Sequence, residues 1–429
     1  MLRSRPLLVL SLFLAGALPA AAQAVEAEPI LPASRLVAPG TPLSGPGWRV
    51  ASPVAVRGYL GQFELSTPQG AIDVQGRELL AIRIAEVPAL ARLEEVSRGE
   101  VFAESIADSA KATGRAVVRV VTNPAETVKG IPAGIGRLLQ RTARKVRQVA
   151  VAVGDAAQRE RDGGGDGDGD GDGDGGDSAA KVRDFATEIA GVNKARRAIA
   201  KAMGIDPYTS NPLLQGRLED LAWASVAGGL SMDLALGAVG GLAADVLSTS
   251  GRLDDLVWDL PPEDIRRRLE KDLVDRGAQP LAARDFLRNG AFTPTLQLAF
   301  VGALRDLGRP RGEAEVLDLA IGVRDEVHAR FLVQQLRMLA RHADGSDPVV
   351  ALEALEASIA ATTRRGTRLV ALPVDHLSWT EQVETGAASR RGKGVARLVV
   401  AGTVSPMAQR QLAAAGWTVT DGVGLVFVP

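Results

Sequence analysis

The chain of 429 residues contains no cysteine. Disulfide bonds, thiolate nucleophiles and lipid anchors attached to cysteine are therefore excluded, and the fold depends on burial alone. Aromatic residues make up only 4% of the chain, which leaves few surfaces for stacking nucleic-acid bases or sugar rings. The formal net charge of -1 gives no overall attraction to nucleic acid. We expect no nucleic-acid partner.

The familiar catalytic motifs are also missing. The sequence has neither a GxSxG nucleophile elbow nor an HExxH zinc motif. Ser178 and Lys181 have the SxxK spacing of penicillin-recognising enzymes, but no SDN or KTG motif follows, and a serine at this position is explained as a helix N-cap. His328 and His342 are too far apart in the sequence to be metal ligands one helical turn apart. Motifs therefore assign no reaction.

The first residues have the pattern of a secretory signal peptide. Two arginines precede an apolar run from Leu7 to Leu18, and Ala22-Gln23-Ala24 is the small-residue pattern of a cleavage site. The run is shorter than the roughly 20 residues that cross a bilayer as a helix. We expect cleavage, a mature chain beginning near Val25, and export to the periplasm or the extracellular space.

Changes in composition and periodicity predict a mostly α protein. It has helical domains, a small N-terminal β-hairpin and a compact C-terminal α/β unit with a parallel sheet. The hairpin is expected on either side of Pro68-Gln69-Gly70, and the following helix is expected to be interrupted by Pro88. The predicted segments are a signal peptide (1–24), an extended lead-in (25–53), a β-hairpin plus helical domain (54–158), a flexible Gly/Asp linker (159–177), a helical domain (178–364) and the α/β domain (365–429).

The C-terminal unit contains the best candidates for a catalytic site. Asp375 and His376 directly follow its first predicted strand, and Thr403 and Ser405 occupy the corresponding end of the next strand. Open parallel sheets bind their ligands beyond these strand ends. The alternative is that Ser405 is the N-cap of a helix that has proline at its first position, and that Asp375 closes a turn.

The low-complexity run from Gly163 to Asp177 contains only glycine and aspartate. Its aspartates fill ligand positions of the D-x-[DN]-x-[DN]-G calcium loop, but Asp177 stands in place of the final bidentate glutamate and no hydrophobic residue ties the loop down. A glycine-rich segment of one charge sign is also typical of a flexible linker. The weak calcium candidates are Asp166, Asp168, Asp170, Asp174 and Asp177.

A basic amphipathic helix is predicted just upstream of this run. It carries Arg137, Arg141, Arg144 and Lys145, with apolar residues at helical spacing on its other side. Such a helix can bind an anionic membrane surface or a protein partner, or it can be an ordinary helix with a buried stripe. The very apolar segment 224–247 contains two aspartates, which favours a packed helix pair over a membrane span.

Two functions of different classes follow from the sequence. The first is a non-catalytic envelope or secreted protein that acts as an interaction partner or scaffold. The second is a hydrolase or ligand-binding enzyme with its site around Asp375 and His376. A concave, partly apolar pocket at the strand ends would favour the enzyme, and helices that fill this space would count against it.

Overall fold

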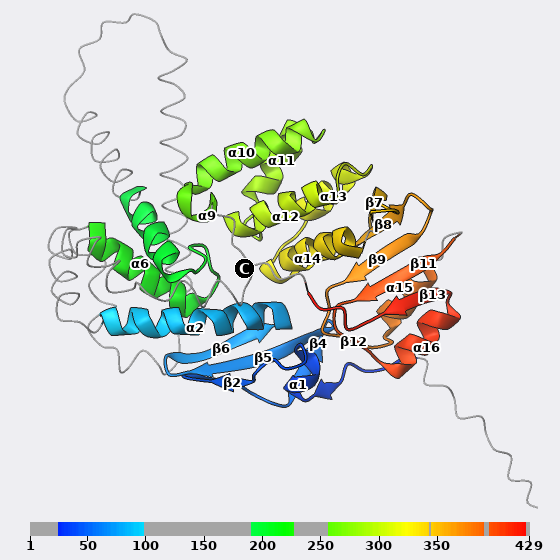
Figure 1. Cartoon of the computed structure of the whole chain (residues 1–429), viewed down its shortest axis with the longest axis horizontal. Helices are drawn as coiled ribbons and strands as arrows, with labels where there is room; N and C mark the ends of the chain where they lie inside the picture. Colours follow the sequence, from blue (N-terminus) through cyan, green and yellow to red (C-terminus); the bar gives the residue numbers. More distant parts are fainter. Residues whose placement is uncertain (1–24, 98–189, 227–255, 343–344, 390–393, 426–429) are drawn as a thin grey trace, which may run out of the picture.

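The computed structural model describes residues 25–97, 190–226, 256–342, 345–389 and 394–425 (Figure 1). Helices predominate in these ranges, and the strands form an N-terminal sheet, a C-terminal sheet and one short parallel pair. The broad expectation of a largely helical chain with smaller β regions is confirmed. The details of both sheets differ from it.

The N-terminal sheet has six strands in the order β1-β4-β5-β3-β2, with β6 paired to β5. Buried and exposed residues alternate along Leu60–Thr67, as in a strand with one face in the core. The predicted hairpin around Pro68-Gln69-Gly70 is confirmed, because Thr67 pairs with Gly70 across this turn. The predicted extended lead-in is wrong, because residues from Ile30 onward form short antiparallel pairs. The strands are β1 (Ile30–Leu31), β2 (Ser44–Gly45), β3 (Trp48–Val50), β4 (Val54–Arg57), β5 (Leu60–Thr67) and β6 (Gly70–Gln75), with helix α1 (Ala33–Leu36) after β1.

Helix α2 (Arg77–Ser97) follows β6 and covers one face of this sheet. Leu80 and Val87 pack with Phe63 and Leu65 of β5 in one core. The predicted interruption at Pro88 is wrong, because α2 continues through this proline. Proline costs the helix one backbone hydrogen bond, and burial of residues on both sides of it, such as Val87 and Leu90, offsets that loss.

The second half of α2 belongs to another helical core. Leu90 and Leu93 pack against Ile199 and Met203 of a helix at 190–203, and against Leu218 of helix α6 (Pro212–Val226). Residues 204–211 form the loop that joins these two helices. Helix α2 therefore connects the N-terminal sheet with the helical part of the molecule (Figure 1).

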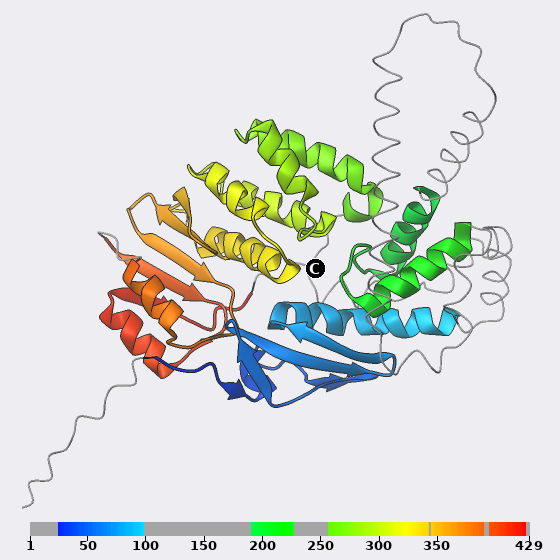
Figure 2. The same ribbon diagram turned by 180° about the vertical axis from the view of Figure 1, so that it is seen from behind.

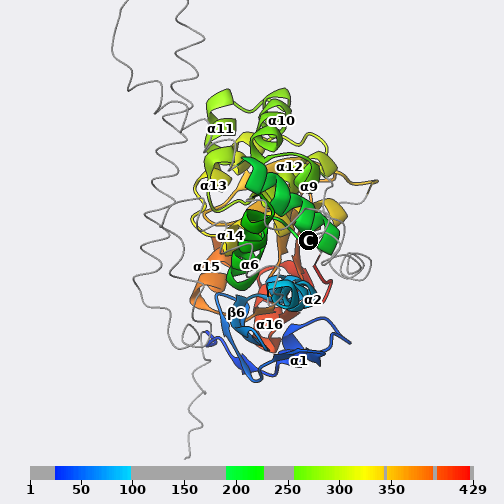
Figure 3. The same ribbon diagram turned by 90° about the vertical axis from the view of Figure 1, so that its left-hand side faces the viewer.

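Helices α10 to α14 form an ordered stack in which α10, α12 and α14 lie side by side (Figure 3). These three helices begin at Pro262, Pro294 and Glu326, so successive members start 32 residues apart. Equivalent positions Leu269, Val301 and Val333 are all buried. Helix α9 (Leu256–Asp259) precedes the stack, whose members are α10 (Pro262–Asp275), α11 (Pro280–Arg288), α12 (Pro294–Asp306), α13 (Glu313–Ile321) and α14 (Glu326–His342).

The C-terminal sheet has five strands in the order β13-β11-β9-β8-β7. Strands β9, β11 and β13 are parallel as predicted, but β7 and β8 are antiparallel, so the sheet is mixed. The expectation that helices continue to about Arg364 is wrong, because residues 349–363 supply these two strands. The strands are β7 (Val349–Ala354), β8 (Ile359–Thr363), β9 (Arg368–Leu372), β11 (Ala396–Val400) and β13 (Trp417–Thr420).

Helices cover both faces of the C-terminal sheet (Figure 2). Helix α14 packs on one face through β8 and β9. Helices α15 (Glu381–Ser389) and α16 (Pro406–Ala414) pack on the other face around Trp379 and Trp417. Strand β13 ends at Thr420, and residues 421–425 are not in a strand.

Among the described helices, none has the combined length and hydrophobicity that a transmembrane span requires.

Candidate functional site

The ends of β9 and β11 bring together all four residues that the sequence singled out. After these strands the chain forms the short strands β10 (His376–Leu377) and β12 (Thr403–Val404), which pair in parallel with His376 opposite Thr403. The Nδ1 atom of His376 lies 2.8 Å from the Oγ1 atom of Thr403. Burial lowers the pKa of His376, so its imidazole is neutral at neutral pH.

Asp375 is 1% exposed and faces the N-terminal sheet. Its carboxylate accepts hydrogen bonds from the backbone N–H of Gly61 at 2.8 Å and of Arg77 at 3.1 Å. The Arg77 guanidinium lies 3.6 Å away. Because Arg77 is the first residue of α2, Asp375 caps that helix from almost 300 residues further along the chain, at a sequence separation of 298. Through these hydrogen bonds, Asp375 connects β5 and α2 to the C-terminal unit.

Burial raises the pKa of Asp375 to about 6, although the amide hydrogen bonds and Arg77 oppose the shift. The carboxylate is therefore mostly ionised at neutral pH. In that state it can pair with Arg77 while it accepts both amide hydrogen bonds.

Ser405 has two structural contacts. Its hydroxyl accepts a hydrogen bond from the backbone N–H of Ala408 at 3.0 Å, so Ser405 is the N-cap of α16 as the sequence suggested. The same hydroxyl donates to the carboxylate of Glu26. Glu26 also accepts from the backbone N–H of Trp379 at 2.7 Å, and its own N–H donates to the Trp379 carbonyl at 2.6 Å.

Residues 26–29, which we call the N-terminal strap, thus run from the C-terminal unit to the N-terminal sheet. The Glu28 carboxylate accepts from the backbone N–H of Tyr59 at 2.7 Å, and the Pro29 carbonyl accepts from Val56 at 2.9 Å. Both contacts lie at the start of the mature chain that the sequence predicts.

The turn between β4 and β5 enters the space beyond the strand ends. Gly58 and Tyr59 both have positive φ, of 57° and 65°, as a tight two-residue hairpin turn requires. The Tyr59 carbonyl accepts from the backbone N–H groups of Asp375 at 3.0 Å and His376 at 3.2 Å. The Tyr59 hydroxyl lies 2.6 Å from Thr380 Oγ1. The N-terminal sheet therefore fills the position where an open α/β sheet would place a ligand.

The space left at this junction is small. A cavity of about 30 Å³ is lined by Arg77, Glu78, Arg330 and Asp375 among others. That volume holds about one or two water molecules. The backbone beside it is also tightly packed, because a Cβ atom at Gly402 would collide with the Asp375 carbonyl. The four candidates lie close together, and each makes its contacts with other residues of the same chain.

Two buried polar networks next to the junction were not predicted from the sequence. In the first, Arg83 of α2 donates to Glu86 at 2.9 Å and to Thr209 at 3.1 Å, and Asn211 donates to Glu86 at 2.9 Å. Arg83 and Glu86 are each 3% exposed. Their position on the apolar side of α2, three residues apart, was the available signal for a buried ion pair.

The second network joins α2 to α14. Gln334 donates to Glu78 at 2.8 Å, and Arg330 donates to Glu326 at 2.8 Å and lies 3.7 Å from Glu78. Burial raises the pKa of Glu78, and Arg330 opposes the shift. Buried charges of this kind have to be paired, so these contacts fix how α14 lies on α2.

The other predicted sites lie outside the described residues. This applies to the calcium candidates Asp166, Asp168, Asp170, Asp174 and Asp177, and to the basic helix with Arg137, Arg141, Arg144 and Lys145. Within the ranges that the structure covers, no group of three or more His, Asp or Glu side chains could hold a metal ion.

No family model, curated protein or solved structure matches this chain.

Proposed function

We propose that this chain is an exported, non-catalytic protein of the envelope or the extracellular space that acts as an interaction partner or scaffold. One observation carries the proposal: the polar groups at the strand ends bind other segments of the same chain. Asp375 binds Gly61 and Arg77, and Ser405 binds Ala408 and Glu26. The signal-peptide pattern at residues 1–24 supports export.

The geometry at the junction offers little for catalysis. A hydrolytic site needs a nucleophile next to a base, donors that stabilise an oxyanion, and room for a substrate. The backbone N–H groups of Gly402 and Thr403 donate to the carbonyls of Val374 and Asp375, so they are not free for an oxyanion. The cavity of about 30 Å³ is far smaller than the roughly 300 Å³ of a small substrate pocket.

The alternative is a hydrolase that uses Thr403 as nucleophile and His376 as base. Their separation of 2.8 Å is within the hydrogen-bond range of such a pair. This contact favours catalysis. Thr403 is exposed and His376 is partly exposed, so both side chains are accessible to a substrate.

An activity assay separates the two functions. The mature chain from Val25 onward is incubated with chromogenic esters, phosphate esters and peptide anilides, next to Thr403→Val and the control Thr418→Val. Thr418 is an exposed threonine on β13. We expect all three proteins to give the rate of buffer alone. Turnover by the wild type and Thr418→Val that Thr403→Val loses, while its melting temperature is unchanged, would establish the hydrolase instead.

The interaction itself is tested by capture from the envelope. Mature wild-type protein is immobilised beside a heat-unfolded sample of the same chain, and bound proteins are compared over a concentration series. We expect at least one envelope protein to bind the folded chain saturably. Equal recovery on the folded and the unfolded chain contradicts the proposal.

A further inference from the structure

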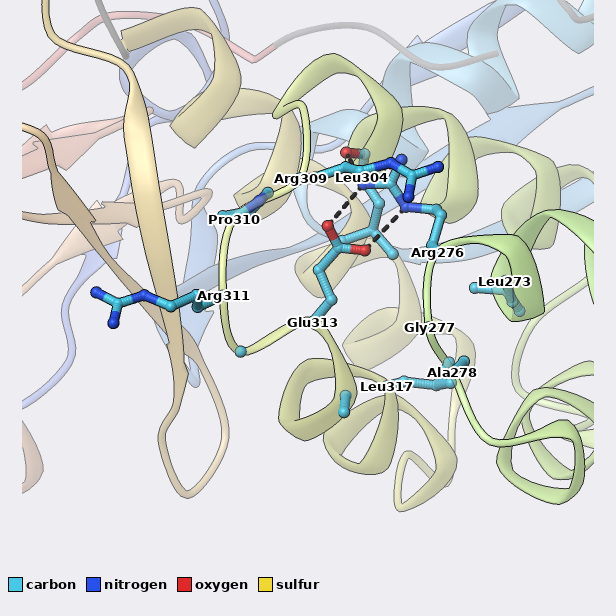
Figure 4. Close-up of a pocket in the computed structure, with 12 residues that line it drawn as sticks. Leu273, Arg276, Gly277, Ala278, Leu304, Arg309, Pro310, Arg311, Glu313 and Leu317 are labelled. Atoms are coloured by element: carbon cyan, nitrogen blue, oxygen red, sulfur yellow. Dashed lines mark hydrogen bonds and ion pairs between the residues drawn. The ribbon is translucent and has the colours of Figure 1, made fainter.

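A cavity of about 290 Å³ lies in the helical stack, where α10 and α12 end and α13 begins (Figure 4). It is about ten times larger than the cavity of about 30 Å³ at the strand ends. Leu273, Leu304 and Leu317 lie behind its wall and are at most 2% exposed, whereas Ala278 and Ala314 present accessible apolar surface. Its charged lining residues are Arg276, Arg309, Arg311 and Glu313.

An ion pair forms one side of the cavity. Arg276 donates through Nε to Glu313 at 2.8 Å and through Nη2 at 2.7 Å, and these are the dashed contacts in Figure 4. The Nη2 atom also donates to the carbonyls of Leu304, at 2.8 Å, and Gly308. This two-point contact neutralises Glu313 and holds both side chains in place.

The remaining two arginines leave a surplus of positive charge. Among the described residues, no acidic side chain lies within ion-pair distance of Arg309 or Arg311. Both are exposed. Figure 4 shows Arg311 directed away from the ion pair of Arg276 and Glu313. Arg309 is therefore the cation available to a ligand in the cavity.

The loop that carries these arginines is fixed to the C-terminal sheet. The backbone N–H of Arg311 donates to Val350 at 3.0 Å, and its carbonyl accepts from Leu352 at 2.7 Å. Gly312 follows with a φ of 90°, and a Cβ atom there would collide with the Leu352 carbonyl. Pro310 is buried. The cavity wall is thus anchored on β7 as well as on the stack.

We propose that this cavity binds a small organic carboxylate with a short apolar chain. The carboxylate pairs with Arg309, and the apolar chain lies against Ala278 and Ala314. A guanidinium is suited to a carboxylate because it can donate two parallel hydrogen bonds. The volume of about 290 Å³ lies at the small end of ligand pockets, so the ligand is small. This site is independent of the proposed interaction function.

Isothermal titration calorimetry with sodium butyrate tests this site on the mature chain from Val25 onward. We expect saturable binding with a dissociation constant of about 1 mM. Arg309→Gln should weaken it at least about tenfold through loss of the charge-assisted hydrogen bonds. The control Arg288→Gln removes the same charge from an exposed arginine that does not line the cavity and should change the constant by less than about twofold.

Neutral butyramide and inorganic phosphate complete the titration. We expect butyramide to bind at least about tenfold more weakly than butyrate, because it lacks the charge. Phosphate should also bind more weakly, because it has no apolar chain to bury. The proposal is overturned by absence of butyrate binding, by equal binding of butyramide, by tighter binding of phosphate, or by equal losses in the two arginine variants.

Discussion

Charged residues lie next to a cavity both at the strand-end junction and in the helical stack, but their contacts and the size of the cavity differ. At the junction, Asp375 and Ser405 bind backbone and side chains of distant segments, and the remaining cavity measures about 30 Å³. In the stack, Arg309 has no acidic partner among the described residues and borders a cavity of about 290 Å³. Candidate residues in the position of an active site can thus be structural, whereas a site without a motif has the room for a ligand.

Removing the Asp375 carboxylate is expected to have the largest effect on stability. Asp375→Ala leaves the Arg77 guanidinium, the buried backbone N–H of Gly61 and the partly buried backbone N–H of Arg77 without their acceptor. We expect the free energy of unfolding, measured by urea titration, to fall by about 3 to 5 kcal/mol. Asp421→Ala is the control, because exposed Asp421 accepts only long hydrogen bonds, of 3.3 Å from Val404 N–H and 3.5 Å from the Gln409 side chain. A loss below about 1 kcal/mol in Asp375→Ala contradicts the structural role.

Asp206 is the counterpart of Asp375 on the side of the stack. Its carboxylate accepts from Thr295 of α12 and from the backbone N–H of Tyr208, each at 2.8 Å. Burial raises its pKa to about 6. Because the folded state binds this proton more tightly than the unfolded state, the stability it contributes is fully present below about pH 4 and is lost as the pH rises through about 6.

Asp206→Asn removes this titration and keeps an oxygen that can accept both hydrogen bonds. Urea titrations of the wild type and the variant are compared between about pH 4 and about pH 8. We expect the variant to gain up to about 3 kcal/mol relative to the wild type over this range. A difference between the two proteins that does not change with pH contradicts this account.

The N-caps of α16 and α12 allow a second comparison between the junction and the stack. Ser405 caps α16 and also donates to Glu26, whereas Thr293 caps α12 in the stack by accepting from Leu296 N–H. We expect Ser405→Ala to cost about 2 kcal/mol of unfolding free energy and Thr293→Ala about 1 kcal/mol, because the threonine has only the capping contact. Thermal or urea unfolding of both variants gives these values. Equal costs would show that the contact with Glu26 adds nothing.

Arg309→Gln should have the smallest effect on stability. Arg309 is exposed and has no acidic partner among the described residues, so its replacement breaks no ion pair there. We expect the free energy of unfolding to change by less than about 0.5 kcal/mol in urea titrations without ligand. A loss above about 1 kcal/mol would show that this arginine is structural, like the polar groups of the junction.

Local sequence patterns predicted local structure well. Ser405-Pro406 predicted the start of α16, and the apolar runs around Val370 and Val399 predicted parallel strands. The sequence also brought Asp375, His376, Thr403 and Ser405 together at one sheet edge, where the structure places them.

The sequence alone did not predict the contacts between residues that are far apart in the chain. Nothing in the residues near Asp375 shows that its partners are Gly61 and Arg77, more than 290 positions earlier, at separations of 314 and 298. Strand β1 has two residues, which is too short to give an alternating pattern. The stack had a usable signal, because Pro262 and Pro294 begin equivalent helices 32 residues apart.

The candidate residues at the strand ends join segments of the chain, and the contact between Glu26 and Ser405 gives a direct measurement of this role. Urea titrations of Glu26→Ala, Ser405→Ala and the double variant form a double-mutant cycle. We predict a coupling energy of about 1 to 2 kcal/mol, because the Ser405 hydroxyl donates to the Glu26 carboxylate across a separation of 379 residues. Additive losses, with a coupling energy near zero, would show that Glu26 and Ser405 do not stabilise each other and would contradict this role.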